Sequence, residues 1–381
     1  MQSCNRAIVQ SCNRAIVQVQ DTSRLAGLAR HSDIISFSLN LQKNEMRIFR
    51  NASLKPYNTF GLEYIAGTII QITSEKEART LFKGELTWKK PLLLVGGGSN
   101  LLFTKDFKGT IVCPRLKRIK IEDQAGEHVT VSAGAGVKWD RFVEWCVEKG
   151  FSGIENLSGI PGNVGAVPVQ NIGAYGMEAK DCILKVRTIS IIDGKVKLYN
   201  NKDCNFGYRS SVFKTFLKGE AMVTRVYFRL NVNHKPNLGY GYLQEEVGKL
   251  GGPTLKNIRT AVLKIRKAKL PDPEIIGNAG SFFKNPVISK ASAGKLVSTF
   301  ASMPVYDDPS GRQKLSAGWL IEQCGWKGIR KGDAGVHEKQ ALVIVNHGKA
   351  SGKEILELSE EIRKSVVKKF GIEMEREVEV I

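Results

Sequence analysis

The sequence lacks the features that mark several large protein classes. It has no run of about 18 apolar residues, so we expect no helix that crosses a membrane. None of its seven cysteines forms a Cys-x-x-Cys pair, and their spacing suits neither a zinc ribbon nor a disulfide scaffold. A secretory signal is also missing. We therefore expect a reducing cytoplasmic location, no metal site and no membrane partner.

Acidic residues are scarce relative to basic ones. The chain carries 57 Lys and Arg against 37 Asp and Glu, which gives a formal net charge of +20. The electrostatic field of such a positive charge attracts polyanions, which include nucleic acid but also nucleotide substrates and dinucleotide cofactors. No nucleic-acid-binding motif and no pattern of interleaved aromatic and basic residues accompanies the charge. We expect no nucleic-acid partner, although a basic nucleic-acid-binding protein remains the alternative that the charge alone would favour.

The first 45 residues differ from the rest of the chain. They contain the string SCNRAIVQ twice, at residues 3–10 and 11–18, and show no sustained hydrophobic period. Two eight-residue units are too short and too few for a solenoid. Three interpretations remain open: a weakly structured extension, a transit peptide, or translation that begins at Met46. We favour the start at Met46.

The remaining chain mixes strand and helix patterns. Its length of 381 residues predicts two or three domains. Asp193-Gly194 follows an apolar run and predicts a hairpin, and the box Ser351…Glu354 predicts the start of a helix that ends at Gly371. The remaining expected elements are strands at 91–95, 110–113, 128–133, 184–192 and 222–230, and an amphipathic helix at 137–149. These patterns indicate an α+β chain rather than a regular βαβ repeat.

Two glycine-rich segments are candidates for binding a phosphate-bearing ligand. In VGGGSNLLF (95–103), three consecutive glycines free backbone N–H groups to approach a phosphate, and two polar side chains follow them. The spacing is not the G-x-G-x-x-G of a Rossmann fold, and a glycine cluster taken alone is more often a tight turn. The second segment, SGIPGNVGAVPVQNIGAYG (158–176), cannot form a regular helix but can wrap a flat polar ligand with its backbone. Its alternative is a long irregular connection.

Three further segments could act on a substrate. In FGYRSSVFK (206–214), Arg209 supplies a fixed cation for a carboxylate or enolate, unless it is an ordinary surface ion-pair partner. In KLPDPEIIGNAGSFFKNP (269–286), we expect Ser281 at a turn, where a helix cap or turn role is the usual explanation. In the C-terminal IEMEREVEVI, four glutamates at alternate positions would share one face of a strand, which an arbitrary acid-rich edge strand would also explain.

Together and in this order, five strings resemble UDP-N-acetylenolpyruvoylglucosamine reductases. The strings are NTFGLEYIAG, GGGSNLL, SGIPGNVGAVPVQNIGAYG, GYRSSVFK and LPDPEIIGNAGSFFKNP, and the resemblance runs from about Asn58 to the C-terminus. It implies an α+β fold with a two-part FAD-binding module of the vanillyl-alcohol-oxidase-like type and a C-terminal α+β substrate-binding domain. The implied parts are an extension at 1–45, FAD-binding subdomains at 46–116 and 117–265, and a substrate-binding domain at 266–372, with the C-terminal strand 373–381 joining the first subdomain.

The resemblance also implies the reaction and the residues that perform it. The reaction is the reduction of UDP-N-acetylglucosamine enolpyruvate to UDP-N-acetylmuramate by NADPH through FAD, in peptidoglycan precursor synthesis, by a cytoplasmic monomer. Arg209 and protonated Glu377 match the groups that stabilise negative charge, and Ser281 matches the general acid. The implied substrate-binding residues are Tyr240, Lys269 and Asn285, and Tyr240 lies in a loop like that of the branch in which a tyrosine closes over the substrate. The implied FAD-binding residues are Gly96, Gly97, Gly98, Ser99, Asn100, Gly159, Gly162, Gly165, Gln170, Asn171 and Gly173.

The chain departs from the family pattern at three positions. Arg376 stands where proline is common, Glu379 where arginine is common, and Val167 where alanine is common. These departures raise a question about the pKa of Glu377. The competing interpretations are an oxidase of the same fold, which the substrate-side strings oppose, and an inactive homologue, which the intact Arg209, Ser281 and Glu377 oppose.

Overall fold

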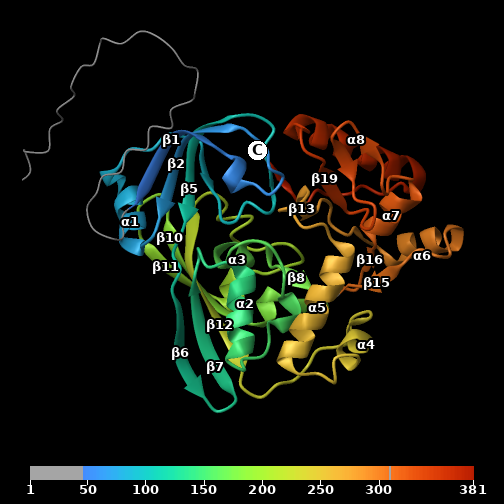
Figure 1. Ribbon diagram of the computed structural model, residues 1–381, viewed down its shortest axis with the longest axis horizontal. Helices are drawn as coiled ribbons and strands as arrows, with labels where there is room; N and C mark the ends of the chain where they lie inside the picture. The colour runs from blue at the N-terminus through green and yellow to red at the C-terminus, as the bar shows by residue number, and fades with distance from the viewer. Residues whose placement is uncertain (1–45, 309) are drawn as a thin grey trace, which may run out of the picture. The chain divides into compact units, whose positions relative to one another are not determined.

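The computed structural model describes residues 46–308 and 310–381, and our interpretations of residues 1–45 lie outside this part. Three principal sheets and the helices packed on them make up the described part (Figure 1). None of its helices combines the length and the apolar character needed to cross a bilayer.

The first sheet contains the strand that leads into the first glycine loop. Its strand order is β1-β2-β5-β3, with β1 antiparallel to β2, and with β5 parallel to both β2 and β3. Apolar side chains such as Ile69 and Ile111 are completely buried beneath it, which explains the short apolar runs of the sequence. The strands are β1 (Arg47–Ser53), β2 (Ile65–Ile72), β3 (Leu92–Leu94) and β5 (Phe107–Pro114), with helix α1 (Glu75–Thr80) after β2.

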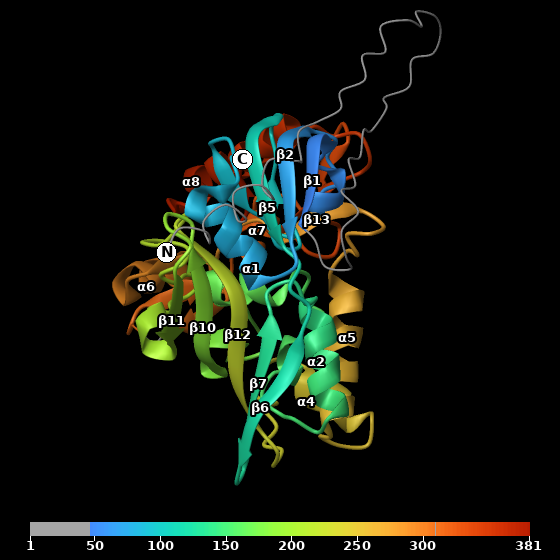
Figure 2. The same cartoon turned by 90° about the vertical axis from the view of Figure 1, so that its left-hand side faces the viewer.

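The second sheet is antiparallel throughout, with the order β11-β10-β12-β7-β6 (Figure 2). Helix α2 (Trp139–Glu148) covers one face, where Trp139 and Phe142 pack with Phe228 at ring separations of 5.8 and 4.8 Å. The expected helix at 137–149 and the expected hairpin are confirmed. The strands are β6 (Ile119–Ala125), β7 (His128–Gly134), β10 (Ile183–Ser190), β11 (Val196–Asn200) and β12 (Ala221–Asn231).

The C-terminal part contains the third sheet, of order β13-β19-β18-β17, and a smaller sheet of order β14-β16-β15. Helix α8 (Gly352–Phe370) begins at the expected capping box and ends at Gly371, whose φ of +67° is the left-handed conformation that favours glycine. The other elements are β13 (Gly277–Ser281), β14 (Val287–Ile288), α6 (Lys290–Thr299), β15 (Val305–Asp307), β16 (Gln313–Leu315), α7 (Ala317–Gln323), β17 (Arg330–Lys331), β18 (Ala334–Val336) and β19 (Val343–Asn346).

Short elements bring distant segments together at the site. The last strand, β20 (Glu379–Val380), pairs in parallel with β4 (Leu101–Leu102), directly after the first glycine loop, so the C-terminus lies beside the first sheet (Figure 1). The domain boundaries given above stay a prediction. The remaining elements are the short α3 (Val167–Gln170), β8 (Gly173–Ala174), β9 (Met177–Glu178) and α4 (Leu243–Gly248), and the longer helix α5 (Leu255–Lys269).

Two local expectations were wrong. Ser281 does not lie in a turn: it is the last residue of β13, after a register shift that accommodates Gly280 at φ +69°. The four C-terminal glutamates do not share one strand face, because a bend at residues 377–378 interrupts the strand. The side chain of Glu375 is 70% exposed and that of Glu377 only 14%. The alternation of glutamates in the sequence therefore does not place their side chains on one face of a strand.

Candidate active site

The two glycine-rich segments meet although they are distant in the sequence. The hydroxyl of Ser99 donates to the carbonyl oxygen of Pro161 at 3.1 Å. A Cβ added to Gly97 would lie 2.9 Å from the Cα of Gly162, which no side chain tolerates without a backbone shift. Glycines in both segments therefore permit a close approach of two backbones, as expected for a cradle around a ligand.

The first glycine loop also packs against the segment before the second strand. Gly98 has φ +68°, and a Cβ added there would lie 2.0 Å from the carbonyl oxygen of Tyr57. The neighbouring Thr59 donates its N–H to the carbonyl of Gly98 at 3.3 Å. Gly96 is less confined, since its added Cβ would meet only side-chain atoms at 3.7 Å. Conformation and space thus both require glycine at position 98.

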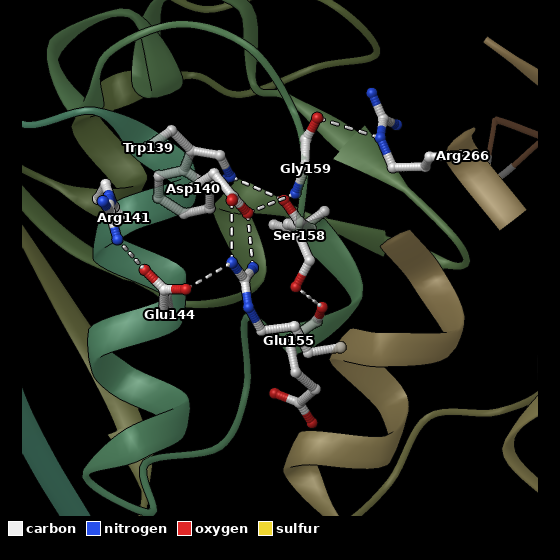
Figure 3. A network of polar contacts seen from close by, with 10 residues as sticks. Trp139, Asp140, Arg141, Glu144, Glu155, Ser158, Gly159 and Arg266 are labelled. Carbon is white, nitrogen blue, oxygen red and sulfur yellow. Dashed lines mark hydrogen bonds and ion pairs between the residues drawn. The ribbon is translucent and has the colours of Figure 1, made fainter. Parts of the chain in front are cut away.

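The second glycine segment is held by a polar network that the sequence analysis missed (Figure 3). Asp140, in the first turn of α2, accepts the N–H of Gly159 at 2.6 Å, and Arg266 of α5 donates to the carbonyl of Gly159 at 3.1 Å. Arg259 of α5 binds both oxygens of Asp140, at 2.6 and 2.9 Å. Trp139 donates its indole N–H to the carbonyl of Leu157 at 2.8 Å. Two helices therefore fix both backbone groups of Gly159.

The ionisation of Asp140 follows from this network. Burial by itself would raise the pKa of Asp140, but the Arg259 guanidinium and the Gly159 N–H outweigh it and leave the pKa below its usual value. The only sequence signal for this contact was the place of Asp140 in the first turn of an expected helix. Arg259 and Arg266 lie seven residues apart on α5, which the sequence analysis did not predict.

The polar groups beside the glycine loops fit an anionic dinucleotide such as FAD. Among the described residues, the hydroxyl of Thr59 and the Nδ2 of Asn163 are buried polar atoms without a hydrogen-bond partner. Thr59 is bonded through its backbone to Gly98, and Asn163 Oδ1 lies 3.4 Å from the position of a Cβ on Gly97. Both unsatisfied atoms can donate a hydrogen bond, and buried donors normally have acceptors. Phosphate oxygens at this cradle would supply them.

Two other expected cofactor-side residues are already engaged within the protein. The amide of Asn171, which is fully buried, donates to Glu178 and to the carbonyl of Gly207, and its oxygen accepts the N–H of Lys180, each at 2.9 Å. Gly165 lies against Ala135, the residue after β7, because a Cβ added to Gly165 would lie 2.6 Å from the Cβ of Ala135. The half-buried Gln170 ends α3. Asn171 thus holds the loop in shape.

Arg209 and Glu377 form an ion pair across segments that are far apart in the sequence. Arg209 Nε lies 2.9 Å from Glu377 Oε1, and the two side chains are 19% and 14% exposed. Arg209 also donates from Nη2 to the carbonyl of Gly173 at 2.9 Å. Its backbone has φ +50°, which costs a non-glycine residue roughly 1–2 kcal/mol. Such strain is concentrated at functional positions, and here it occurs at the residue whose guanidinium contacts Glu377.

Three cations act electrostatically on the carboxyl group of Glu377. Burial raises its pKa, and the opposing charges of Arg209, Lys214 and Lys284 reduce but do not cancel this effect. Glu377 therefore keeps its proton to a higher pH than an exposed glutamate. Lys214 donates to the carbonyl of Arg209 at 3.2 Å, and burial lowers its own pKa.

Ser281 belongs to the same neighbourhood through the backbone. The N–H of Glu377 donates to the carbonyl of Phe282 at 2.8 Å, and Phe283 forms an antiparallel bridge with Arg376. Ser281 is therefore adjacent in the chain to the residue that binds Glu377 through its backbone. The structure thus brings together the segments that carry Arg209, Ser281 and Glu377.

The expected substrate-binding residues lie in two places. Asn285 borders a cavity of about 480 Å³ together with Tyr208 and Lys284, and its oxygen accepts the N–H of Ala317 at 3.0 Å. Lys269, the last residue of α5, places its Nζ 5.6 Å from the centre of the Tyr242 ring. Tyr240 packs edge-on against Tyr175 at 6.0 Å and is 53% exposed. Lys269 and Tyr240 therefore belong to the α4–α5 side of the site.

Comparisons with known proteins identify the family. A profile described as UDP-N-acetylenolpyruvoylglucosamine reductase, C-terminal domain, matches residues 272–381, and one described as FAD binding domain matches residues 67–198. The UDP-N-acetylenolpyruvoylglucosamine reductase of Flavobacterium johnsoniae is 46% identical over 339 residues, which are 88% of this chain and 100% of that protein. The enzyme of the same name from Bacteroides fragilis is 45% identical over 330 residues, or 86% of this chain and 98% of that protein. The chain belongs to this reductase family.

A solved structure agrees with the family assignment. The UDP-N-acetylenolpyruvylglucosamine reductase (MurB) of Thermus caldophilus superposes with a TM-score of 0.61 at 27% identity, covering 88% of this chain and 99% of that one. The expected α+β fold class, with an FAD-binding module and a C-terminal domain, is confirmed, as is the expectation of an FAD-dependent oxidoreductase. The roles of individual residues stay predictions.

The departures from the family pattern have local partners in the structure. Arg376 pairs with Glu360 of α8 at 2.5 Å, and Glu379 pairs with Lys218 at 2.6 Å. The two unusual charges are therefore each compensated by a neighbour of opposite sign. Val167, the third departure, is buried at the start of α3 and adds only apolar volume there.

Proposed function

We propose that this member of the reductase family converts UDP-N-acetylglucosamine enolpyruvate to UDP-N-acetylmuramate with NADPH as the donor, in peptidoglycan precursor synthesis. The observation that carries the proposal is the ion pair of Arg209 and Glu377, whose side chains are both largely shielded from solvent. It lies where the second glycine segment, the strand that ends at Ser281 and the C-terminal segment converge. This convergence supports a reductase site in which negative charge is stabilised and a proton is donated beside a flavin.

The two glycine segments are suited to hold FAD, with Thr59 and Asn163 as free donors for its phosphates. Bound in this cradle, FAD would supply hydride transfer from NADPH to the substrate, a chemistry that side chains cannot supply. The protein contributes alignment, stabilisation of charge and a proton.

Arg209 and Glu377 stabilise the charge that the reaction creates. When the terminal vinyl carbon of the substrate gains a hydride, negative charge develops on the adjacent carbon and on the carboxylate. The Arg209 guanidinium, fixed by the Gly173 carbonyl, supplies a preorganised positive charge there. Glu377, whose pKa is raised by burial, supplies a hydrogen-bond donor while it is protonated.

Ser281 completes the reduction by protonating the adjacent carbon. A serine hydroxyl is a weak acid, so it donates a proton only to a strongly basic centre, and a carbanion-like carbon is such a centre. The new C–H bonds then come from one hydride and one proton, which balances the reduction of the double bond.

Asn285, Lys269 and Tyr240 bind the substrate in this proposal. Lys269 offers a cation for a diphosphate, and the exposed Tyr240 is free to close over it. We further propose that the enzyme acts in the cytoplasm, and we expect a monomer.

An anaerobic test separates the two halves of the reaction. The purified protein is reduced with NADPH, and UDP-N-acetylglucosamine enolpyruvate is then added while the flavin absorbance is followed. We expect rapid reoxidation with formation of UDP-N-acetylmuramate. Ser281→Ala should slow this second step by roughly 10²–10⁴-fold, the usual contribution of a general acid, and spare the first step.

Two results would contradict this proposal. If NADPH reduces the flavin but only oxygen restores it, the substrate assignment is wrong and an oxidase becomes the better interpretation. If Ser281→Ala slows both steps equally, Ser281 has no specific role as the acid.

A further inference from the structure

Asn100 ends the first glycine loop and was assigned above to the cofactor. In the structure its side chain is engaged elsewhere: Nδ2 donates to the backbone carbonyl of Glu377 at 2.9 Å. The carbonyl of Asn100 also accepts the N–H of Glu379 at 3.0 Å. Backbone and side chain of one loop residue thus bind the residues on either side of Val378.

Glu377 is consequently held at each of its polar groups by a different segment. Its N–H binds the carbonyl of Phe282 at 2.8 Å, its carbonyl accepts from Asn100, and its carboxylate meets Arg209. Arg209 in turn binds the carbonyl of Gly173. These contacts link the first glycine loop to the second glycine segment through Glu377.

The bend at residues 377–378 explains why this support is needed. A regular strand would satisfy the carbonyl of Glu377 through its ladder, but β20 begins only at Glu379. The Asn100 amide replaces the missing ladder partner at a position where the side chain must turn inward. In Glu379, which does lie in β20, the backbone is held by the parallel pairing with β4 and the side chain is 37% exposed.

We propose that Asn100 is a positioning residue, whose amide holds the Glu377 backbone so that the carboxyl group faces Arg209, and which couples the first glycine loop to that acid. This inference rests on the function proposed for Glu377 above. Asn100 acts through Glu377 and does not itself touch the reacting atoms.

The proposal predicts a selective defect. Loss of this hydrogen bond leaves the half-buried Glu377 carbonyl without its partner, and a displaced catalytic group slows the reaction. We expect Asn100→Asp and Asn100→Ala to slow reoxidation of the reduced flavin by substrate about tenfold, which corresponds to ~1.4 kcal/mol. Asn100→Asp keeps the shape but replaces the donor with an acceptor and adds a negative charge, so the uncharged Asn100→Ala shows which part of the effect comes from the lost hydrogen bond.

A second readout separates positioning from general damage. If Glu377 moves away from its buried place, its carboxyl becomes better hydrated and loses its proton at lower pH. The alkaline limb of the reoxidation rate should then move to lower pH in Asn100→Ala, whereas the negative charge added by Asn100→Asp opposes this shift. The affinity for FAD, measured by fluorescence quenching with the apoprotein, should stay close to that of the wild type.

Thr104→Val is the matched control. The Thr104 hydroxyl donates to the carbonyl of Ile381 at 2.9 Å, so it joins the same two segments, and the Thr104 N–H keeps its own bond to that carbonyl at 3.0 Å. Because this contact lies beyond Glu377, Thr104→Val should leave the reoxidation rate and its pH profile unchanged.

The outcomes are distinguishable. Wild-type reoxidation by substrate in Asn100→Asp would overturn the inference while leaving the proposed function intact. A loss of FAD affinity in the Asn100 variants, with a normal rate once FAD is saturating, would show that Asn100 binds the cofactor. This outcome would also overturn the inference. Failure of the wild type itself to be reoxidised by substrate would instead overturn the proposed function, and this inference with it.

Discussion

The glycine loops and the Glu377 cluster lie beside each other but are built on different physical principles. The loops are defined by what cannot fit: a Cβ on Gly97 or Gly98 would lie within 3 Å of a neighbouring backbone. The cluster is defined by charge, with a buried carboxyl facing three cations. The first region should therefore respond sharply to added volume, and the second to changes in ionisation.

The difference also explains how each region is supported. The carbonyl of Gly98 is bound by the backbone of Thr59. Apart from its N–H, which binds the Phe282 carbonyl, Glu377 is held by the side chains of Asn100 and Arg209, which come from two different segments. A backbone-packed loop is rigid whatever its charge, whereas a side-chain-held acid can be moved by one substitution. The predictions below test this contrast.

Gly98→Ala should have the largest effect. The added Cβ would lie 2.0 Å from the Tyr57 carbonyl oxygen, and φ +68° is unfavourable for alanine, so the loop must shift. We expect loss of more than about 3 kcal/mol of stability, or failure to retain FAD, because clash and backbone strain add. Thermal unfolding and the flavin content of the purified protein would measure it.

Gly126→Ala is the matched control. Gly126, in the β6–β7 hairpin, has φ +57°, but an added Cβ there would have no atom within 4 Å. It should cost only the backbone strain, about 1–2 kcal/mol, and retain FAD. If Gly98→Ala and Gly126→Ala lost equal stability, backbone strain alone would explain both, and steric exclusion would not distinguish the glycine loop.

The sequence revealed the loops more readily than their supports. Runs of glycine are visible in composition, and their order matched a family pattern, so residues 96–98 and 159–165 were found directly. Asp140, Arg259 and Arg266 were missed because ordinary charged residues on helices give no signal until the fold brings them to Gly159. Long-range polar contacts of this kind depend on tertiary packing, which local periodicity does not contain.

In the acid-rich C-terminus, too, local sequence periodicity failed to predict the structure. Its alternating pattern predicted four equivalent glutamates, but the bend at 377–378 buries Glu377 and leaves Glu375 in solvent. The role of Asn100 was invisible for the same reason, because its partner lies 277 positions away in the chain. Resemblance to a family located the acid, and only the backbone path explained its burial.

Asp140→Asn should have an intermediate effect, and it tests whether charge also matters on the loop side. Substitution leaves the guanidinium of Arg259, which is 10% exposed, without its full partner. We expect a loss of about 2 kcal/mol, below the value for fully buried pairs because the Asp140 side chain is 38% exposed. Chemical denaturation would measure it, with Arg141→Gln on the exposed face of α2 as the control.

The same pair gives stability a pH dependence of known sign. The pKa of Asp140 is lower in the folded protein than its usual value, so the folded state binds fewer protons at this group. Its contribution is therefore complete above the unfolded pKa and is lost as the pH falls through the folded pKa. The wild type should lose its advantage over Asp140→Asn on acidification, and a constant difference between them at all pH values would contradict this account.

Lys218→Gln should have the smallest effect, and it tests how far the charge-defined region extends. Lys218 and Glu379 form a pair whose side chains are 60% and 37% exposed, so its loss should change the free energy of unfolding by less than about 0.5 kcal/mol. The unpaired Glu379 would add a negative charge two residues from Glu377, which favours the protonated acid. The alkaline limb of the reoxidation rate should therefore move slightly to higher pH, and high salt should abolish the change. Glu379→Gln should move it the other way, and a large rate loss in either variant would place Glu379 inside the active cluster.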